Sequence, residues 1–240
     1  MSMESKRMKH VVIAGATGLV GCELIRQLHA RPEIAFTALV RRAGVLTALS
    51  DRVKEVVFDY EDPASYERLG REIPCDVLLC ALGSTRKKAG SREAFRKVDF
   101  GLPLALLRRA AALDTRPVFG LVSAAGAGHP RGFYLRTKAE VEKALLDSGL
   151  PYVIVRPSLL LGDRPELRLG ERLATVLVAK PFLALAKTFA PHSGLIWKYA
   201  PIEGAKVAEA LIRFCVDEPP QAQGRVVSGI ALHHPILELN

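Results

Sequence analysis

The sequence predicts an α/β protein built on a doubly wound parallel sheet, with helices on both faces and a small helical region toward the C-terminus. Short apolar runs rich in β-branched residues alternate with stretches in which apolar residues recur at helical spacing. The first of these runs leads directly into a turn that carries three glycines. No run reaches the roughly 18 uninterrupted apolar residues of a membrane-spanning helix, so no integral membrane segment is expected.

The glycine turn is the most informative stretch. Apolar residues 11–14 enter Gly15-Ala16-Thr17-Gly18-Leu19-Val20-Gly21, and residues 19–28 then follow helical spacing. Gly15 would permit a tight turn, Gly18 a close backbone approach to a ligand, and Gly21 close packing of the helix on the strand. The start of the helix would offer free N–H groups to a pyrophosphate. This pattern predicts a Rossmann-like dinucleotide site; a glycine turn that binds nothing is the alternative.

The other elements follow from the same alternation. Further strands are expected over residues 34–40, 53–58, 76–82, 117–122, 152–155 and 225–228, and further helices over residues 45–50, 65–71, 91–113, 134–146 and 202–216. The 76–82 run is apolar throughout, which is typical of a central strand. No internal repeat or linker divides the chain, so residues 1–240 are expected to form one domain.

A small substrate or lid region is expected at about residues 160–200. Residues 173–190 are apolar but are interrupted by Lys180-Pro181, which predicts two short helices. These helices would cover the mouth of the site or make a subunit contact, as in a homodimer. Contact with a membrane surface is a further alternative for this segment.

Composition narrows the class of protein. The formal net charge of +9 suits nucleic acid, an anionic membrane surface, a phosphate-rich ligand, or simply a basic solvated surface. Nucleic acid is disfavoured because the arginines do not alternate with aromatic residues and no DNA-binding motif is present. The four cysteines are scattered without a CxxC pair, so no metal site is expected. Because the N-terminus lacks a secretory apolar region, we expect a reduced, cytoplasmic protein.

Charged residues follow three of the expected strands. Arg41 and Arg42 come after the 34–40 run, where an acidic residue would hold the ribose of NAD and arginine accommodates the 2′-phosphate of NADP. They therefore favour NADP(H), with solvated arginines as the alternative. Asp59 would accept a hydrogen bond from an adenine amino group or serve as an ordinary turn residue. The loop residues 86–88 would contact phosphates or an acidic substrate, or be solvated.

Ser123, Tyr134 and Lys138 carry the predicted chemistry. Tyr134 and Lys138 are four residues apart, so they lie on one face of the expected helix. A nearby ammonium favours the tyrosinate and lowers the tyrosine pKa, which would let Tyr134 exchange a proton with a substrate carbonyl or alcohol. Ser123 ends the preceding strand and would hydrogen-bond the same oxygen. The alternative is an ordinary surface pair on a helix.

These motifs resemble the short-chain dehydrogenase/reductase superfamily in its extended or atypical branch. The set consists of the glycine turn, Ser123, Tyr134-x-x-x-Lys138 and Arg156-Pro157. Residues 80–90, 97–99, 134–142 and 156–164 are similar to the Tat-interacting-protein-like oxidoreductases, an epimerase-like group. The resemblance implies a Rossmann-type fold, NADP(H) binding and catalysis by Tyr134 and Lys138. It also implies cofactor contacts at Gly15, Thr17, Gly18, Leu19, Val20, Arg41, Arg42, Leu82, Gly83, Pro157, Ser158 and Leu159.

Two departures from the superfamily pattern matter. The asparagine that many members carry after the fourth strand has no counterpart, since the stretch reads Lys97-Val98-Asp99-Phe100-Gly101. The region after residues 152–155 is shorter than in sugar-nucleotide epimerases, which argues against a bulky nucleotide-sugar substrate. Two functions follow as hypotheses: an NADP(H)-dependent oxidoreductase acting on a small carbonyl or alcohol, and a non-catalytic NADPH-binding module that responds to redox state and contacts other proteins.

Overall fold

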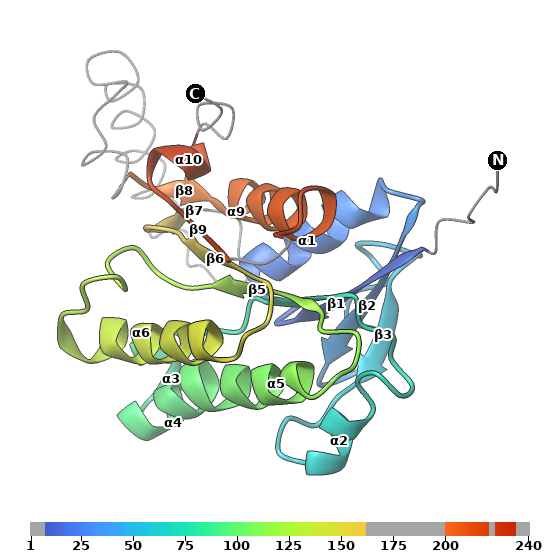
Figure 1. Cartoon of the computed structure of the whole chain (residues 1–240), viewed down its shortest axis with the longest axis horizontal. Helices are drawn as coiled ribbons and strands as arrows, with labels where there is room; N and C mark the ends of the chain where they lie inside the picture. The colour runs from blue at the N-terminus through green and yellow to red at the C-terminus, as the bar shows by residue number, and fades with distance from the viewer. Residues whose placement is uncertain (1–7, 162–199, 221–223, 234–240) are drawn as a thin grey trace.

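The computed structural model describes residues 8–161, 200–220 and 224–233 (Figure 1). Seven strands form the central sheet: β1 (Lys9–Ala14), β2 (Ile34–Val40), β3 (Lys54–Val57), β4 (Val77–Cys80), β5 (Val118–Val122), β6 (Tyr152–Arg156) and β9 (Arg225–Ser228). Two short strands, β7 (Leu160–Leu161) and β8 (Ile202–Glu203), pair separately.

The helices connect these strands. They are α1 (Leu19–His29), α2 (Pro63–Glu67), α3 (Arg86–Ala89), α4 (Arg92–Arg96), α5 (Leu102–Ala111), α6 (Gly132–Asp147), α9 (Gly204–Ile212) and α10 (Ile230–His233). Two π-helical segments interrupt or extend them. The first, η1 (Lys97–Gly101), joins α4 to α5, and the second, η2 (Arg213–Asp217), continues α9.

The sheet has the order β3-β2-β1-β4-β5-β6-β9, and each neighbouring pair is parallel. The chain therefore winds outward from β1 in one direction and from β4 in the other, which confirms the predicted doubly wound Rossmann-like fold. In such a sheet, ligands bind at the carboxyl ends of the strands near the point where the order reverses. That point lies between β1 and β4, where the glycine turn and the 81–85 loop leave the sheet.

Helices cover both faces of the sheet (Figure 1). On one face α1 packs against α9, while α2, α5 and α6 lie on the other. Alternate residues of β1 divide between the two cores, since Val11 and Ile13 belong to the first and Val12 and Ala14 to the second. Both layers are thus needed to bury a sheet whose central strands are apolar on each side.

The predicted strands agree well with the structure, and the predicted helices less well. The 34–40 and 225–228 strands have the expected bounds. The helix expected at 45–50 is wrong: turns occupy this stretch, because the Glu55 carboxylate accepts hydrogen bonds from the amides of Gly44, Val45 and Leu46. The helical stretch expected at 91–113 is present as α4, η1 and α5 in direct succession, and the π-helical geometry of η1 is the part that the sequence did not predict.

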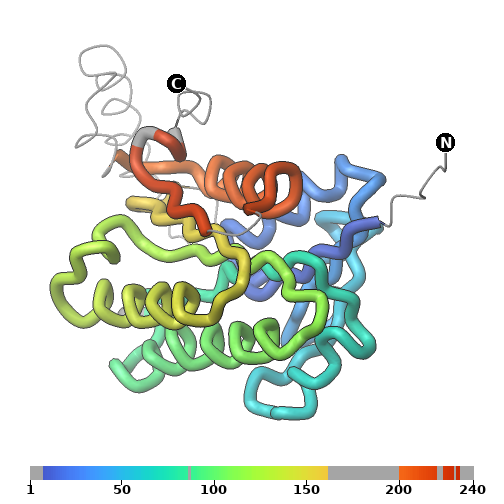
Figure 2. Tube along the Cα trace, in the orientation of Figure 1, coloured from blue at the N-terminus to red at the C-terminus, as the bar shows by residue number. Residues whose placement is uncertain are grey.

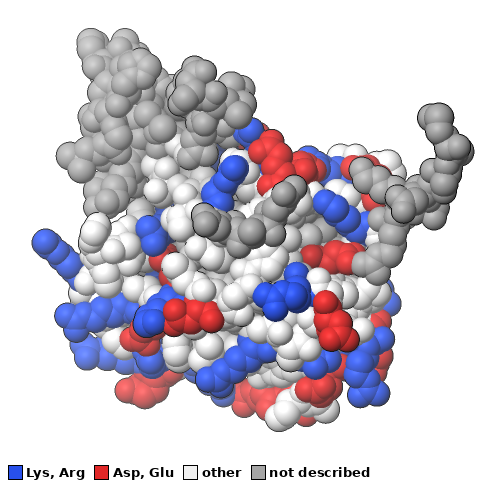
Figure 3. Space-filling view, in the orientation of Figure 1, with Lys and Arg blue, Asp and Glu red and all other residues white. Residues whose placement is uncertain are grey.

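The described surface is mixed in charge. On the face drawn in Figure 3, Lys and Arg side chains alternate with Asp and Glu and do not merge into one basic patch. Within the described ranges, none of the helices has the length and apolar character that a membrane span requires. The helices and subunit contact expected over residues 173–190, and most of the lid expected at 160–200, lie outside the described residues.

Candidate functional site

The glycine turn has the geometry that the sequence predicts. Gly15 has φ of +82°, and a Cβ there would lie 2.6 Å from the backbone carbonyl of Ala81. A Cβ on Gly21 would overlap the Gly15 carbonyl oxygen, so the close approach of α1 to the turn requires glycine. The Gly18 N–H donates to Gly15 O at 3.0 Å, and Thr17 and Gly18 are exposed. The start of α1 therefore presents backbone to solvent at the carboxyl edge of the sheet.

The side chains of Leu19 and Val20, beside the glycine turn, expose little surface to a ligand. Val20 is buried in the first core, and Leu19 lies half-buried against Gly204. Any ligand contact at these two positions would therefore come mainly from their backbone amides.

Arg41 and Arg42 follow β2 and are exposed. Neither forms a hydrogen bond or an ion pair with another described residue, so both guanidinium groups are available to a ligand. Asp59 is also exposed, and its carboxylate accepts the Glu61 N–H at 2.9 Å, as a turn residue does. This contact explains Asp59 without an adenine, although one carboxylate oxygen remains available.

Tyr60 is an unexpected neighbour of the glycine turn. Its hydroxyl is buried and makes no hydrogen bond of ordinary geometry within the described part of the chain. Burial raises the pKa of Tyr60 well above its usual value, while the nearby Gly15 amide and Arg41 charge oppose that rise. The Gly15 amide acts on this hydroxyl, so the Tyr60 phenol lies beside the backbone of the glycine turn.

Lys138 and Asp99 form a buried ion pair beyond the end of β4. Lys138 Nζ lies 2.7 Å from Asp99 Oδ1, and the two side chains are 8% and 0% exposed. Asp99 Oδ2 accepts the Ser84 N–H at 2.8 Å. Burial raises the pKa of the Asp99 carboxyl, and the Lys138 ammonium and the Ser84 amide counteract it. The pair lies next to Gly83, where a Cβ would be 3.5 Å from Oδ1 and 3.6 Å from Nζ.

The π-helical segment η1 supplies Asp99. Its wider turns interrupt the helix at the place where it packs against α6, and such π segments occur frequently at functional sites. Asp99 therefore occupies the region in which the sequence offered no asparagine. In this region the chain offers a carboxylate in direct contact with Lys138.

Tyr134 lies in the first turn of α6, on the face that carries Lys138. Its ring packs on Phe95 with centroids 5.6 Å apart, and 38% of the residue is exposed. Burial of its hydroxyl end raises its pKa; the Lys138 charge lowers the pKa and the Asp99 charge raises it. The expected effect of Lys138 is present, but burial and Asp99 outweigh it. The pKa of Tyr134 is therefore raised, and not lowered as the sequence predicted.

Ser123 belongs to a different cluster. Its hydroxyl donates a short hydrogen bond to the buried carboxylate of Glu142 on α6. The same carboxylate accepts hydrogen bonds from Arg156 Nε at 3.0 Å and from Arg156 Nη2 at 2.5 Å. No hydrogen bond joins Ser123 to Tyr134 among the described residues. The structure thus brings Tyr134 and Lys138 together and places Ser123 with Glu142 and Arg156.

The remaining expected contacts lie at the same sheet edge. Leu82 and Gly83 follow β4, with Gly83 exposed. After β6, Pro157 is buried, the Ser158 hydroxyl donates to the Ala200 carbonyl, and Leu159 is 66% exposed. Among Pro157, Ser158 and Leu159, only Leu159 has a side chain that is largely exposed. The side chains of Arg86 and Lys87 lie outside the described set.

Asp99 and Glu142 are the site residues that sequence reasoning missed. Each is a carboxylate on a helical face that is otherwise apolar, and Glu142 stands four residues after Lys138, as Lys138 does after Tyr134. A charged residue at such a position is rarely buried without a partner. A charged residue in such a position therefore marks Asp99 and Glu142 as candidate buried residues. Only the fold shows that Asp99 pairs with Lys138 and Glu142 with Arg156.

Comparison with known proteins assigns the family. A family model described as NAD(P)H-binding matches residues 15–175. The chain belongs to the NAD(P)H-binding family. The "Protein fmp52, mitochondrial" of Aspergillus fumigatus is 30% identical over 224 residues, which cover 90% of this chain and 93% of that protein. The "Protein FMP52, mitochondrial" of Candida albicans is 36% identical over 159 residues, or 64% and 68% of the two chains.

Solved structures show the same fold at low identity. The UDP-Glc/GlcNAc 4-epimerase of Campylobacter jejuni matches with a TM-score of 0.66 and 16% identity, over 95% of this chain and 82% of that one. The Bordetella bronchiseptica enzyme WbmH, solved in complex with NAD+, matches with a TM-score of 0.64 and 17% identity, over 91% and 74%. At this identity the likeness concerns the fold. The resemblance to the Tat-interacting-protein-like group stays a prediction.

The relatives correct one expectation. The cytoplasmic location expected from the cysteines and the N-terminus is wrong, because the relatives at 30% and 36% identity are named mitochondrial. A mitochondrial protein can also keep its thiols reduced, so the free cysteines do not separate the two compartments.

The described residues of this NAD(P)H-binding chain fit a dinucleotide. Glycines at positions 15 and 21 let the turn lie against the loop after β4 and against the start of α1, which leaves the exposed backbone of Thr17 and Gly18 at the carboxyl edge of the sheet. The buried hydroxyl of Tyr60 lies beside the same turn. Amides of residues 15–20 would hold a pyrophosphate, and Arg41 and Arg42 would hold a 2′-phosphate if one is present.

Proposed function

We propose that the chain is an NADP(H)-dependent oxidoreductase of the short-chain dehydrogenase/reductase type, acting on a small carbonyl or alcohol. The observation that carries this proposal is the placement of Tyr134 beside the buried Lys138 ammonium, at the sheet edge where the glycine turn lies. A bound nicotinamide supplies the hydride chemistry. The protein residues have to position the cofactor, hold the substrate and move one proton.

Cofactor selection would rest on charge at the end of β2. Arg41 and Arg42 are exposed, have no partner among the described residues, and stand where arginine accommodates a 2′-phosphate. No carboxylate follows β2 directly to hold a ribose hydroxyl. These features support NADP(H) over NAD(H).

The proton would pass through Tyr134. The raised pKa keeps the phenol protonated at neutral pH, which suits donation to a carbonyl oxygen during reduction. Lys138 would stabilise the tyrosinate that forms and would also reach ribose hydroxyls. Asp99 fixes the ammonium in place. Because the Ser123 proton points to Glu142, Ser123 can accept a hydrogen bond from the substrate but needs to rotate before it can donate one.

The Tyr134→Phe variant tests the role of the phenol. We expect it to lower kcat by about 10²–10⁴-fold, because the proton donor is removed, while the Kd for NADPH changes little. Turnover is measured by nicotinamide absorbance with a panel of aldehydes, ketones and quinones. Tyr152→Phe, which removes a phenol from β6 at the opposite edge of the sheet, is the matched control. Full activity of Tyr134→Phe on a substrate that the wild type reduces would refute the assignment.

A non-catalytic NADPH-binding module is the second candidate. Two observations favour it: Lys138 is already neutralised by Asp99, and the Ser123 hydroxyl is already bound to Glu142. Lys138 would have to act while paired with Asp99, and the Ser123 hydroxyl would have to leave Glu142 before it could donate to a substrate. Tight NADPH binding combined with no substrate-dependent change in nicotinamide absorbance across the panel would support the module over the enzyme.

We also propose a mitochondrial location, on the strength of the relatives' names. Fractionation of cells that express the full chain checks it, with recovery in the mitochondrial fraction as the expected result.

A further inference from the structure

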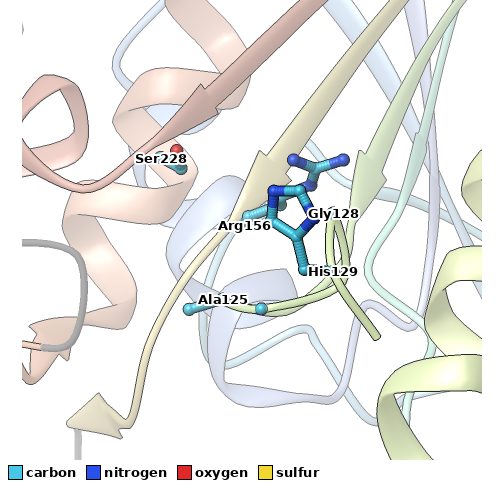
Figure 4. A pocket seen from close by; sticks show the side chains of 6 residues that line it. Ala125, Gly128, His129, Arg156 and Ser228 are labelled. Carbon is cyan, nitrogen blue, oxygen red and sulfur yellow. The ribbon is translucent and has the colours of Figure 1, made fainter. Parts of the chain in front are cut away.

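A pocket of about 120 Å³ opens beside the Ser123, Glu142 and Arg156 cluster, at the carboxyl ends of β5, β6 and β9. It is lined by Ala125, Gly126, Gly128, His129, Arg156 and Ser228 (Figure 4). Arg156 and His129 lie close together on one side, and Ser228 faces them from the end of β9. None of these six residues is acidic. Figure 2 shows the β5–α6 loop, which supplies four of them, arching away from the sheet before it returns as α6.

The Arg156 guanidinium is held rigidly with one edge free. Its Nε and Nη2 donate to Glu142, whose side chain is 4% exposed and does not line the pocket. Nη1 donates no hydrogen bond to any described residue. Gly128 packs against this part of the guanidinium, and a Cβ there would lie 2.8 Å from Nη1, so a larger residue at position 128 would displace the arginine.

The Glu142 carboxylate orients the arginine without competing for the pocket. Its oxygens already accept the Ser123 hydroxyl and two guanidinium nitrogens, and the carboxylate lies outside the pocket lining. The pocket therefore offers hydrogen-bond donors from Arg156, and groups that can donate from His129 and Ser228, with no carboxylate in its lining.

We propose that this pocket binds the oxyanion group of an acidic substrate, a carboxylate or a phosphate ester. Arginine pairs with such groups through charge-assisted N–H donors, which makes it a selective partner for them. A pocket of about 120 Å³ has room for one such group. That the bound molecule is then reduced or oxidised rests on the proposed function.

The test adds a negative charge at His129, an exposed residue of the pocket lining. His129→Glu places a negative charge in the pocket, and His29→Glu, on the exposed end of α1, makes the same change at the opposite edge of the sheet. Calorimetric titration of the full chain, with and without NADPH, uses three probes: pyruvate, inorganic phosphate and the uncharged ketone 2-butanone. Arg156→Lys is a second variant that keeps the charge but loses the planar fork.

We expect pyruvate, phosphate or both to bind the wild type, and 2-butanone to bind at least tenfold more weakly. His129→Glu and Arg156→Lys should each weaken anion binding at least fivefold, and His29→Glu should leave it unchanged. Binding of pyruvate alone identifies a carboxylate site, and of phosphate alone a phosphate site. The inference is overturned if neither anion binds, if 2-butanone binds equally well, or if the two glutamate variants behave alike. Titrations without NADPH separate this outcome from a failure of the proposed function.

Discussion

At the residue scale, Asp99 illustrates how one buried carboxylate sets the behaviour of two other groups. It neutralises Lys138 and, through its charge, raises the pKa of Tyr134. Breaking a buried pair of this kind leaves an uncompensated charge, which generally costs about 3–5 kcal/mol of stability. The Ser84 amide on the second carboxylate oxygen ties the pair to the loop after β4. Asp99 is therefore a positioning residue, and its removal should change the pKa of the Tyr134 phenol.

The Asp99→Asn variant should lower the pKa of Tyr134. The Asp99 carboxylate disfavours the tyrosinate, and it also neutralises the Lys138 ammonium that favours it, so both effects of the substitution act in the same direction. Ultraviolet titration, read as the difference from the same background carrying Tyr134→Phe, reports the value. Asp147→Asn, at the far end of α6, removes an exposed carboxylate and is the control. An unchanged or higher pKa in folded Asp99→Asn would show that the ion pair does not act on the phenol.

At the element scale, a single arginine joins α1 to β2. The Arg52 guanidinium donates to the carbonyls of His29 at 2.6 Å and Ile34 at 2.9 Å. It also donates to the carbonyls of Leu28, Arg31 and Pro32. These carbonyls belong to the end of α1, the turn that follows it and the start of β2, where helix and strand ladders leave acceptors available. The Arg52 side chain therefore holds the connection between α1 and β2, the strand that leads to Arg41.

Arg52→Lys should destabilise the protein by roughly 2 kcal/mol, because a lysine keeps the charge but cannot reach this many carbonyls. Urea unfolding measures the loss. Arg108→Lys, at an exposed position on α5, should change the free energy of unfolding by less than about 0.5 kcal/mol. Equal effects of the two variants would mean that the carbonyl contacts of Arg52 add nothing to stability.

The elements also show what sequence patterns can and cannot predict. The 34–40 strand was predictable because its residues are almost all apolar or β-branched and polar residues bound it, and the 225–228 strand because glycines bound a short run with a valine pair. The π-helical η1 was not, since its apolar residues keep a spacing that an uninterrupted helix shares. Turns replace the 45–50 helix because the distant Glu55 binds their amides, and local periodicity carries no information about that contact.

At the scale of the whole molecule, the parallel sheet brings distant segments to one edge. The glycine turn, the 81–85 loop and the β5–α6 loop meet there because each follows a strand of the same direction. This much of the site could be predicted from strand order alone. The pairings of Asp99 with Lys138 and of Glu142 with Arg156 could not, because they depend on how the helices rotate against the sheet. The contact between Ser123, directly after β5, and Glu142 depends on the same rotation.

The most direct measurement is a crystal structure of the full chain soaked with NADP+. The account predicts a pyrophosphate on the amides of residues 15–20, a 2′-phosphate between Arg41 and Arg42, and a nicotinamide ring beside the Tyr134 hydroxyl. A nicotinamide far from Tyr134, or a cofactor bound away from the glycine turn, would contradict it.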